Sequence, residues 1–118
     1  MKLFDEDIKP QVDEARRTYP AVRDRFMAGL PEGQKLFVAD RLFDERGRFI
    51  QAYVAVTKID RGIIEGRVAS DVERVSGYRP GDPFAFPENE LIDWAIVHSD
   101  GTEEGNVLGR FMETFRPR

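Results

Sequence analysis

The spacing of apolar residues changes near residue 35, and this change constrains the fold more than any other feature of the sequence. Before it, apolar side chains recur every three or four residues, as on one face of a helix: Ile8, Val12, Ala15, Tyr19, Val22 and Phe26. After it, apolar and polar residues alternate, which is typical of a strand with one buried face. The chain therefore begins as a helix and continues as a sheet.

Two prolines punctuate the helical stripe. Pro10 suits the first turn of a helix, where its missing N–H costs nothing. Pro20 removes a hydrogen bond from a continuous helix and pushes Tyr19 away from helical backbone angles. We therefore expect two short helices, at about residues 9–18 and 20–29, or one sharply kinked helix. The stripe covers fewer than three heptads, so it predicts a face that packs on the core rather than a coiled-coil seam.

Alternation and turn residues predict the rest of the fold. Three strands, at about residues 35–43, 49–59 and 63–69, are joined by short turns and form an antiparallel meander. A short strand that begins at Pro83 suits a sheet edge, and residues 92–97 form the last strand. Helical spacing predicts a final helix at 107–115, capped by Asn106.

Together these elements predict an α+β fold made of one domain over residues 1–118. It has an N-terminal helical segment at about 9–29, a curved antiparallel sheet of about five strands within 35–97, and a short C-terminal helix. We expect both helices to cover one face of the sheet. That leaves the other face, or the polar segment at 70–80, as the place for a site.

Composition excludes several classes of function. The 118 residues contain no cysteine and one histidine, which argues against a structural zinc site and against a cysteine nucleophile. The net charge is −4, and basic residues alternate with acidic ones, so we expect no nucleic-acid partner. No apolar run is long enough for a membrane span, and the acidic N-terminus is no signal peptide. We expect a cytoplasmic protein.

No catalytic motif is found. His98, Ser99 and Asp100 are adjacent at a turn and cannot converge as a triad. The acidic stretches at 5–7 and 100–106 lack the spacing of a calcium loop, and no glycine-rich phosphate loop is present. We therefore expect no catalytic residue, no metal and no cofactor.

Five residues are candidates for binding. Aromatic and arginine side chains dominate the energetics of interfaces, which selects Trp94, Tyr53, Tyr78 and Arg79, and Asp93 stands beside Trp94. The alternative for Trp94 and Tyr53 is packing in the core. The alternative for Asp93 is a structural hydrogen bond, for instance one that caps a turn.

The chain is similar to the bacterial YegJ-like family, a domain of unknown function. The resemblance lies in the strand 52–56, the hairpin 59–66, the segment 81–86, the pair Asp93–Trp94 and the upstream helix 14–20. Tyr53 stands where the family usually has a tryptophan, and residues 110–115 are less typical. The resemblance implies a compact α+β domain and brings no activity, cofactor or catalytic residue.

The leading hypothesis for function is a non-catalytic domain that binds a protein partner, present as a monomer or a weak homodimer. One alternative is an immunity-type partner, which offers an acidic surface to a basic toxin or effector. Another is a small hydrolase that uses Asp93 or Glu90 near Trp94. The hydrolase loses its support if Asp93 caps a turn and Trp94 is buried. An edge at residues 83–86 could also pair with a second copy.

Overall fold

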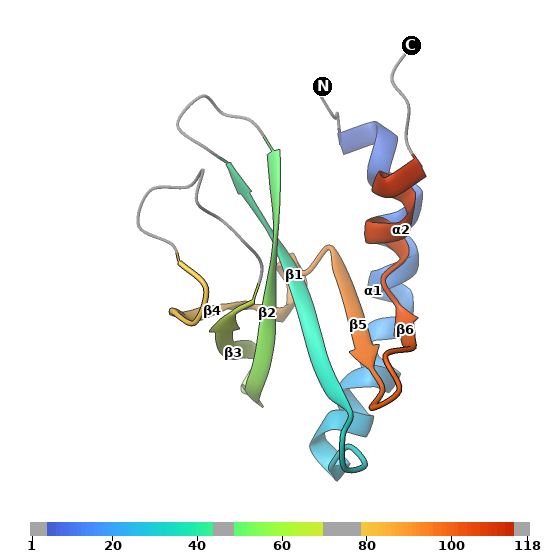
Figure 1. The fold of residues 1–118 in the computed structure, drawn as a ribbon. Coiled ribbons are helices and arrows are strands. Elements are labelled where there is room, and N and C mark those ends of the chain that lie inside the picture. The colour runs from blue at the N-terminus through green and yellow to red at the C-terminus, as the bar shows by residue number, and fades with distance from the viewer. Residues whose placement is uncertain (1–4, 44–48, 70–78, 115–118) are drawn as a thin grey trace.

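A computed structural model describes residues 5–43, 49–69 and 79–114, and it contains a helical N-terminal segment, a sheet and a short C-terminal helix. The elements, in chain order, are α1 (Asp5–Ala28), β1 (Lys35–Phe43), β2 (Phe49–Asp60), β3 (Ile63–Val68), β4 (Pro83–Pro87), the 3₁₀ helix η1 (Glu88–Glu90), β5 (Asp93–Val97), β6 (Glu103–Gly105) and α2 (Val107–Thr114) (Figure 1). The α+β fold class is confirmed. Within the described residues, neither helix has the length and apolar character needed to cross a bilayer.

The six strands form one antiparallel sheet in the order β4-β3-β2-β1-β5-β6. The meander β1-β2-β3 continues to β4 at one edge, and the chain then returns so that β5 pairs with β1 on its other side (Figure 1). Arg61 and Gly62 form the tight turn between β2 and β3, both with positive φ (52° and 80°), as a type I′ hairpin requires. The sequence did not predict β6, because three residues are too few for alternation to show.

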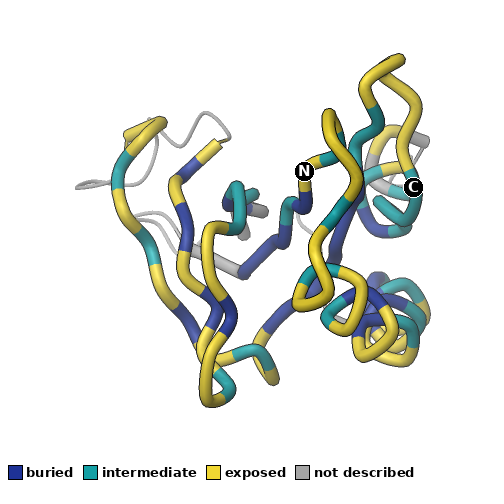
Figure 2. Tube along the Cα trace, turned by 90° about the horizontal axis from the view of Figure 1, so that it is seen from below, coloured by how far each residue is buried: buried dark blue, intermediate teal, exposed yellow. Residues whose placement is uncertain are grey.

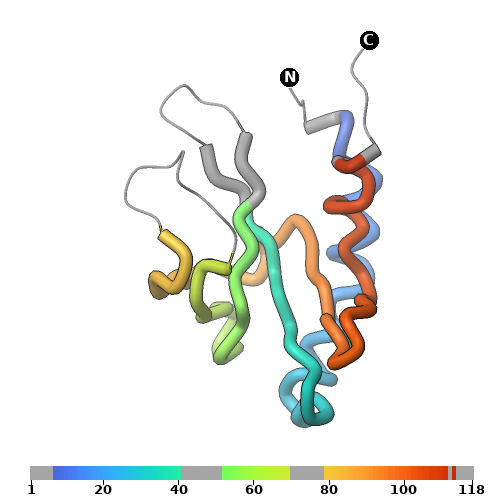
Figure 3. The backbone as a smooth tube through the Cα atoms, in the orientation of Figure 1, coloured from blue at the N-terminus to red at the C-terminus, as the bar shows by residue number. Residues whose placement is uncertain are grey.

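Helix α1 is continuous from Asp5 to Ala28, so the prediction of two helices that meet at Pro20 is wrong. Because Pro20 has no N–H, the carbonyl of Arg16 lacks its usual partner within the helix. Both residues are exposed, so water can solvate that carbonyl. Buried residues on either side of Pro20, Tyr19 and Val22, hold the helix against the sheet. The helix ends where predicted, because Gly29 takes a positive φ of 98° after it. Figure 3 shows how the chain then turns into β1.

The larger core lies between α1 and one face of the sheet. Val54, Val38 and Trp94 form one row across β2, β1 and β5, and their side chains share this face. Ala15, Tyr19 and Val22 of α1 pack against the same cluster. Buried positions are dark blue in Figure 2. We call this side of the sheet the α1 face.

The next row along the strands, Tyr53, Ala39 and Asp93, points to the opposite face. Helix α2 begins there: Leu108 packs against Ala39 in a second cluster, which Ile8 of α1 joins. The two helices therefore meet each other (Figures 1 and 3), and the N-terminal part of α1 shares this second cluster with α2. The expectation that both helices cover one face does not hold for the larger core, whose described residues come from α1 and not from α2, because Asp93 holds the start of α2 beside the opposite row.

Candidate functional site

The carboxylate of Asp93 is fully buried and accepts four hydrogen bonds. The backbone N–H groups of Trp94 and Val107 donate to Oδ1 at 2.9 and 3.1 Å. The backbone N–H of Gly109 and the hydroxyl of Tyr53 donate to Oδ2, each at 3.1 Å. Val107 and Gly109 lie in the first turn of α2, where N–H groups have no partner within the helix. Asp93 therefore caps α2 from a neighbouring strand.

Two opposing effects act on the charge of Asp93. Burial raises the pKa of its carboxyl, and the hydrogen bonds from Gly109, Trp94, Tyr53 and Val107 lower it again, with the net shift upward. The positive end of the α2 dipole also favours a carboxylate at this position. For Tyr53, burial raises the pKa of the phenol, and the charge of Asp93 raises it further. The tyrosine therefore stays a neutral donor.

A short chain of hydrogen bonds continues from Tyr53 to the surface. The Tyr53 hydroxyl lies 2.8 Å from Oδ1 of Asn106, and Nδ2 of Asn106 donates to Oε1 of Glu103 at 2.9 Å. Because a phenol has one proton, Tyr53 shares it between Asp93 and Asn106. Asn106 has a φ of 57°, a conformation that asparagine tolerates better than most residues. We call Asp93, Tyr53 and Asn106 the Asp93 cluster.

Gly109 allows α2 to approach the Asp93 cluster. A Cβ at this position would lie 2.0 Å from Oδ1 of Asn106 and 2.8 Å from the Tyr53 hydroxyl, closer than a side chain can pack. Any residue other than glycine would therefore displace either the Asn106 side chain or the first turn of α2.

A pocket of about 290 Å³ opens beside the Asp93 cluster, on the side of the sheet opposite the α1 face. Phe37 and Ala95 face each other across β1 and β5, and the small alanine leaves space beside the phenylalanine. The walls combine apolar and polar groups: Phe37, Tyr53, Ala69, Ala95, Val97, Glu103 and Asn106. An apolar floor with a few polar groups at one end is typical of binding pockets. We call it the sheet-face pocket.

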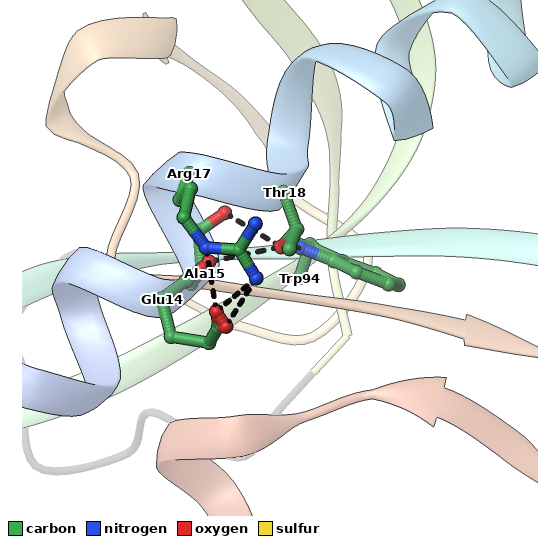
Figure 4. Close-up of polar contacts among 5 residues, drawn as sticks. All are labelled: Glu14, Ala15, Arg17, Thr18 and Trp94. Atoms are coloured by element: carbon green, nitrogen blue, oxygen red, sulfur yellow. Dashed lines mark hydrogen bonds and ion pairs between the residues drawn. The ribbon is translucent and has the colours of Figure 1, made fainter.

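Trp94 belongs to the core. Its side chain is 8% exposed on the α1 face, and its Nε1 donates to Oγ1 of Thr18 at 2.9 Å. The Thr18 hydroxyl in turn lies 3.0 and 3.2 Å from the carbonyls of Glu14 and Ala15 (Figure 4). Trp94 thus fixes α1 on the sheet and cannot reach a ligand in the sheet-face pocket.

The structure brings together two of the five binding candidates, Tyr53 and Asp93. Arg79 is exposed at a turn, where its N–H donates to Oδ2 of Asp82 at 3.0 Å, and Tyr78 lies outside the described residues. The sequence did not single out Phe37 and Ala95 as binding residues, because only strand register brings them beside Tyr53. Asn106 was predicted as a helix cap, but its bond to Tyr53 depends on the tertiary fold.

The observed contacts remove the support for the hydrolase hypothesis. Asp93 caps a helix, Trp94 is buried, and Glu90 is exposed on η1. His98 lies 2.7 Å from Oε2 of Glu104, in the hairpin between β5 and β6. Within the described part of the chain, no three His, Asp or Glu side chains converge as metal ligands. Comparison with protein-family models, with curated proteins and with solved structures finds no match in any of the three.

Proposed function

We propose that the protein is a non-catalytic binding domain and that the sheet-face pocket receives an apolar side chain of a protein partner. The observation that carries this proposal is the pocket itself, about 290 Å³ with an apolar floor, beside a cluster that holds one wall in place. Its volume, at the lower end for ligand pockets, suits one large apolar side chain.

The groups around the pocket support binding rather than acid–base catalysis. Asp93, which bonds the Tyr53 wall but does not line the pocket, already accepts four hydrogen bonds and is fully buried. A general base must reach the proton that it removes, and the bonded donors and the burial both oppose this. Asp93 instead positions Tyr53, which lines the pocket together with Asn106, and holds the start of α2 just beyond Asn106.

The sheet edges favour a partner that approaches the face. The N–H of Val68 donates to the carbonyl of Asp82, and the N–H of Glu88 donates to the carbonyl of Gly62. With the strand register, these bonds make the backbone groups of Phe84 and Phe86 point inward to β3. Pro83, Ala85 and Pro87 are the residues whose backbone points outward, and the two prolines have no N–H. Within the described sheet, the outer edge of β4 therefore offers a single N–H donor, which disfavours added strands.

We also propose membership of the YegJ-like family and a cytoplasmic location. The segments 52–56 and 81–86 and the pair Asp93–Trp94 support the family, since Asp93 and Trp94 have distinct structural roles that would favour their retention together. The absence of cysteine and the net charge of −4 support the location and argue against a nucleic-acid partner.

A screen of small apolar fragments by two-dimensional NMR tests the binding function. We expect aromatic and branched aliphatic fragments to shift the amide signals of Phe37, Tyr53 and Ala95, with dissociation constants in the millimolar range expected for ligands of so few atoms. Ala95→Leu, which fills the floor of the pocket, should abolish these shifts.

Ala21→Leu is the matched control, because it makes the same change at an exposed position on α1. Fragments should bind this variant as they bind the original protein. Shifts scattered over the surface, or shifts that persist in Ala95→Leu, would show that the pocket is not the binding site.

A further inference from the structure

The acidic rim of the sheet-face pocket limits the kind of partner that fits it. Glu103 lines the pocket, and Val97 and Glu103 stand opposite each other on β5 and β6. Glu103 is exposed and, within the described chain, accepts one hydrogen bond, from Asn106. Because a carboxylate has two oxygens with several acceptor positions, Glu103 can bind a further donor without giving up that bond.

Other negative charges reinforce Glu103 at this end of the pocket. The charges of Asp93, Glu103 and Glu113 all act on the Tyr53 hydroxyl, which forms part of the pocket wall. Two cations of the described residues stand in this part of the fold. Arg110 donates to the carbonyl of Gly105, and Lys35 stands two strands from Glu103 in the row through Val97, without an ion pair between Lys35 and Glu103. Neither cation lines the pocket, whereas Glu103 does.

The partner must therefore present an apolar group with a positive charge beside it. We infer that the sheet-face pocket holds a leucine or aromatic side chain of a basic peptide segment, whose neighbouring lysine or arginine pairs with Glu103. This inference rests on the proposed function and adds the chemistry of the partner. The net charge of −4 would also speed the approach of a basic segment. An immunity-type protein that neutralises a basic effector would use this chemistry.

Three synthetic peptides test the inference on the full chain by NMR titration: acetyl-Gly-Lys-Leu-Lys-Gly-amide, the same peptide with glutamate in place of both lysines, and the lysine peptide with serine in place of leucine. We expect the lysine–leucine peptide to shift the signals of Phe37 and Ala95 and to bind about fivefold to tenfold more tightly than the glutamate peptide, since an exposed ion pair contributes up to about 1 kcal/mol and like charges repel. The serine peptide should not shift these signals.

Glu103→Gln separates a specific pair from general attraction to an acidic protein. In this variant the preference for lysine over glutamate should fall to within about twofold. The matched control is Glu90→Gln, which removes the same charge from an exposed position on η1 outside the pocket, and there the preference should remain. Raising the salt concentration should weaken the preference in the original protein.

The results distinguish failure of this inference from failure of the proposed function. If apolar fragments bind the pocket but the lysine and glutamate peptides bind equally well, or if Glu103→Gln keeps the preference, the basic partner is wrong and the binding function stands. If neither fragments nor peptides shift Phe37 and Ala95, both proposals are overturned.

Discussion

Asp93 is the residue on which the site depends, although it is not offered to a ligand. Its four donors come from three parts of the chain: Tyr53 on β2, its neighbour Trp94 on β5, and the first turn of α2. Loss of the Asp93 carboxylate would leave several buried donors without partners, and each would reduce the stability of the fold by about 1–3 kcal/mol. The cluster therefore stabilises α2 and fixes one wall of the pocket at once.

Gly109→Ala tests how closely α2 must approach this cluster. In an ordinary helix this change stabilises by up to about 1 kcal/mol. Here the added carbon would meet Asn106 and Tyr53, so we expect the free energy of unfolding to fall by about 1–3 kcal/mol, as measured by urea denaturation.

The cause can be checked in an Asn106→Gly background, which removes the nearer of the two atoms and suits the positive φ. There the effect of Gly109→Ala should be smaller. A Gly109→Ala protein as stable as the original would mean that Asn106 or α2 can move aside at little cost.

At the scale of elements, the sheet ends in two edges that are poor templates for further strands. On β4, Pro83 and Pro87 occupy two of the three outward-facing positions. Strand β6 has three residues. Backbone hydrogen bonds from His98 to Thr102 and from Asn106 to Trp94 show that the backbone groups of Glu104 point inward to β5, so those of Glu103 and Gly105 face outward. Hence the suggestion that residues 83–86 pair with a second copy receives little support from the backbone.

Replacing both prolines of β4 by threonine tests this reasoning. The double variant gains two outward N–H donors, which at about 1 kcal/mol each correspond to roughly tenfold tighter self-association or more. Analytical ultracentrifugation over a range of concentrations should detect dimers in the variant at concentrations where the original protein has few.

Ala85→Thr is the control, since that position already has its outward N–H. It should associate no more than the original protein. If the double variant also behaves as the original does, something other than the prolines limits pairing at this edge.

At the scale of the whole molecule, polar contacts tie α1 to distant parts of the chain on both sides of the core. Near its middle, Tyr19 and Arg23 both donate to Glu88 of η1, at 2.9 and 3.0 Å. Near its end, Arg25 binds both oxygens of Glu104 on β6, at 2.9 and 3.0 Å. The hydrogen bonds from Arg25 and then His98 lower the pKa of Glu104 to about 2.

This pKa predicts how stability depends on pH. Because the pKa of Glu104 in the folded protein lies below its ordinary value of 4.5, its stabilising contribution is present above about pH 4.5 and is lost as the pH falls towards 2. The side chain is 40% exposed, so solvent screening limits the effect to at most about 1 kcal/mol. The original protein should therefore be more stable than Glu104→Gln at pH 6, and the difference should disappear near pH 2, as measured by urea denaturation at each pH.

Asp93 has the opposite sign, because its raised pKa makes its contribution largest at low pH and smaller as the pH rises. The contribution of Asp93 is the same in the original protein and in Glu104→Gln, so it cancels in the difference between their stabilities. Glu32→Gln, at an exposed position before β1, is the matched control. A difference for Glu104→Gln that stays constant from pH 6 to pH 2 would contradict the assigned ion pair.

The sequence by itself determined the local structure of the protein. Helical spacing in α1, alternation in β1 to β3 and the residues of the turns at Gly29 and at Arg61–Gly62 are properties of neighbouring residues, so they predicted the α+β class and most element positions. The continuity of α1 through Pro20 escaped prediction, because burial on the sheet outweighs the lost hydrogen bond.

Only the tertiary structure decided the site. The sequence singled out Asp93 and Trp94 together, but successive residues of a strand point to opposite faces, so one holds α2 and the other holds α1. Strand register, which joins segments far apart in the chain, places Phe37 opposite Ala95, and it places Tyr53 and Asp93 in one row on either side of Ala39. No local pattern contains that information, because a pocket forms where distant residues meet.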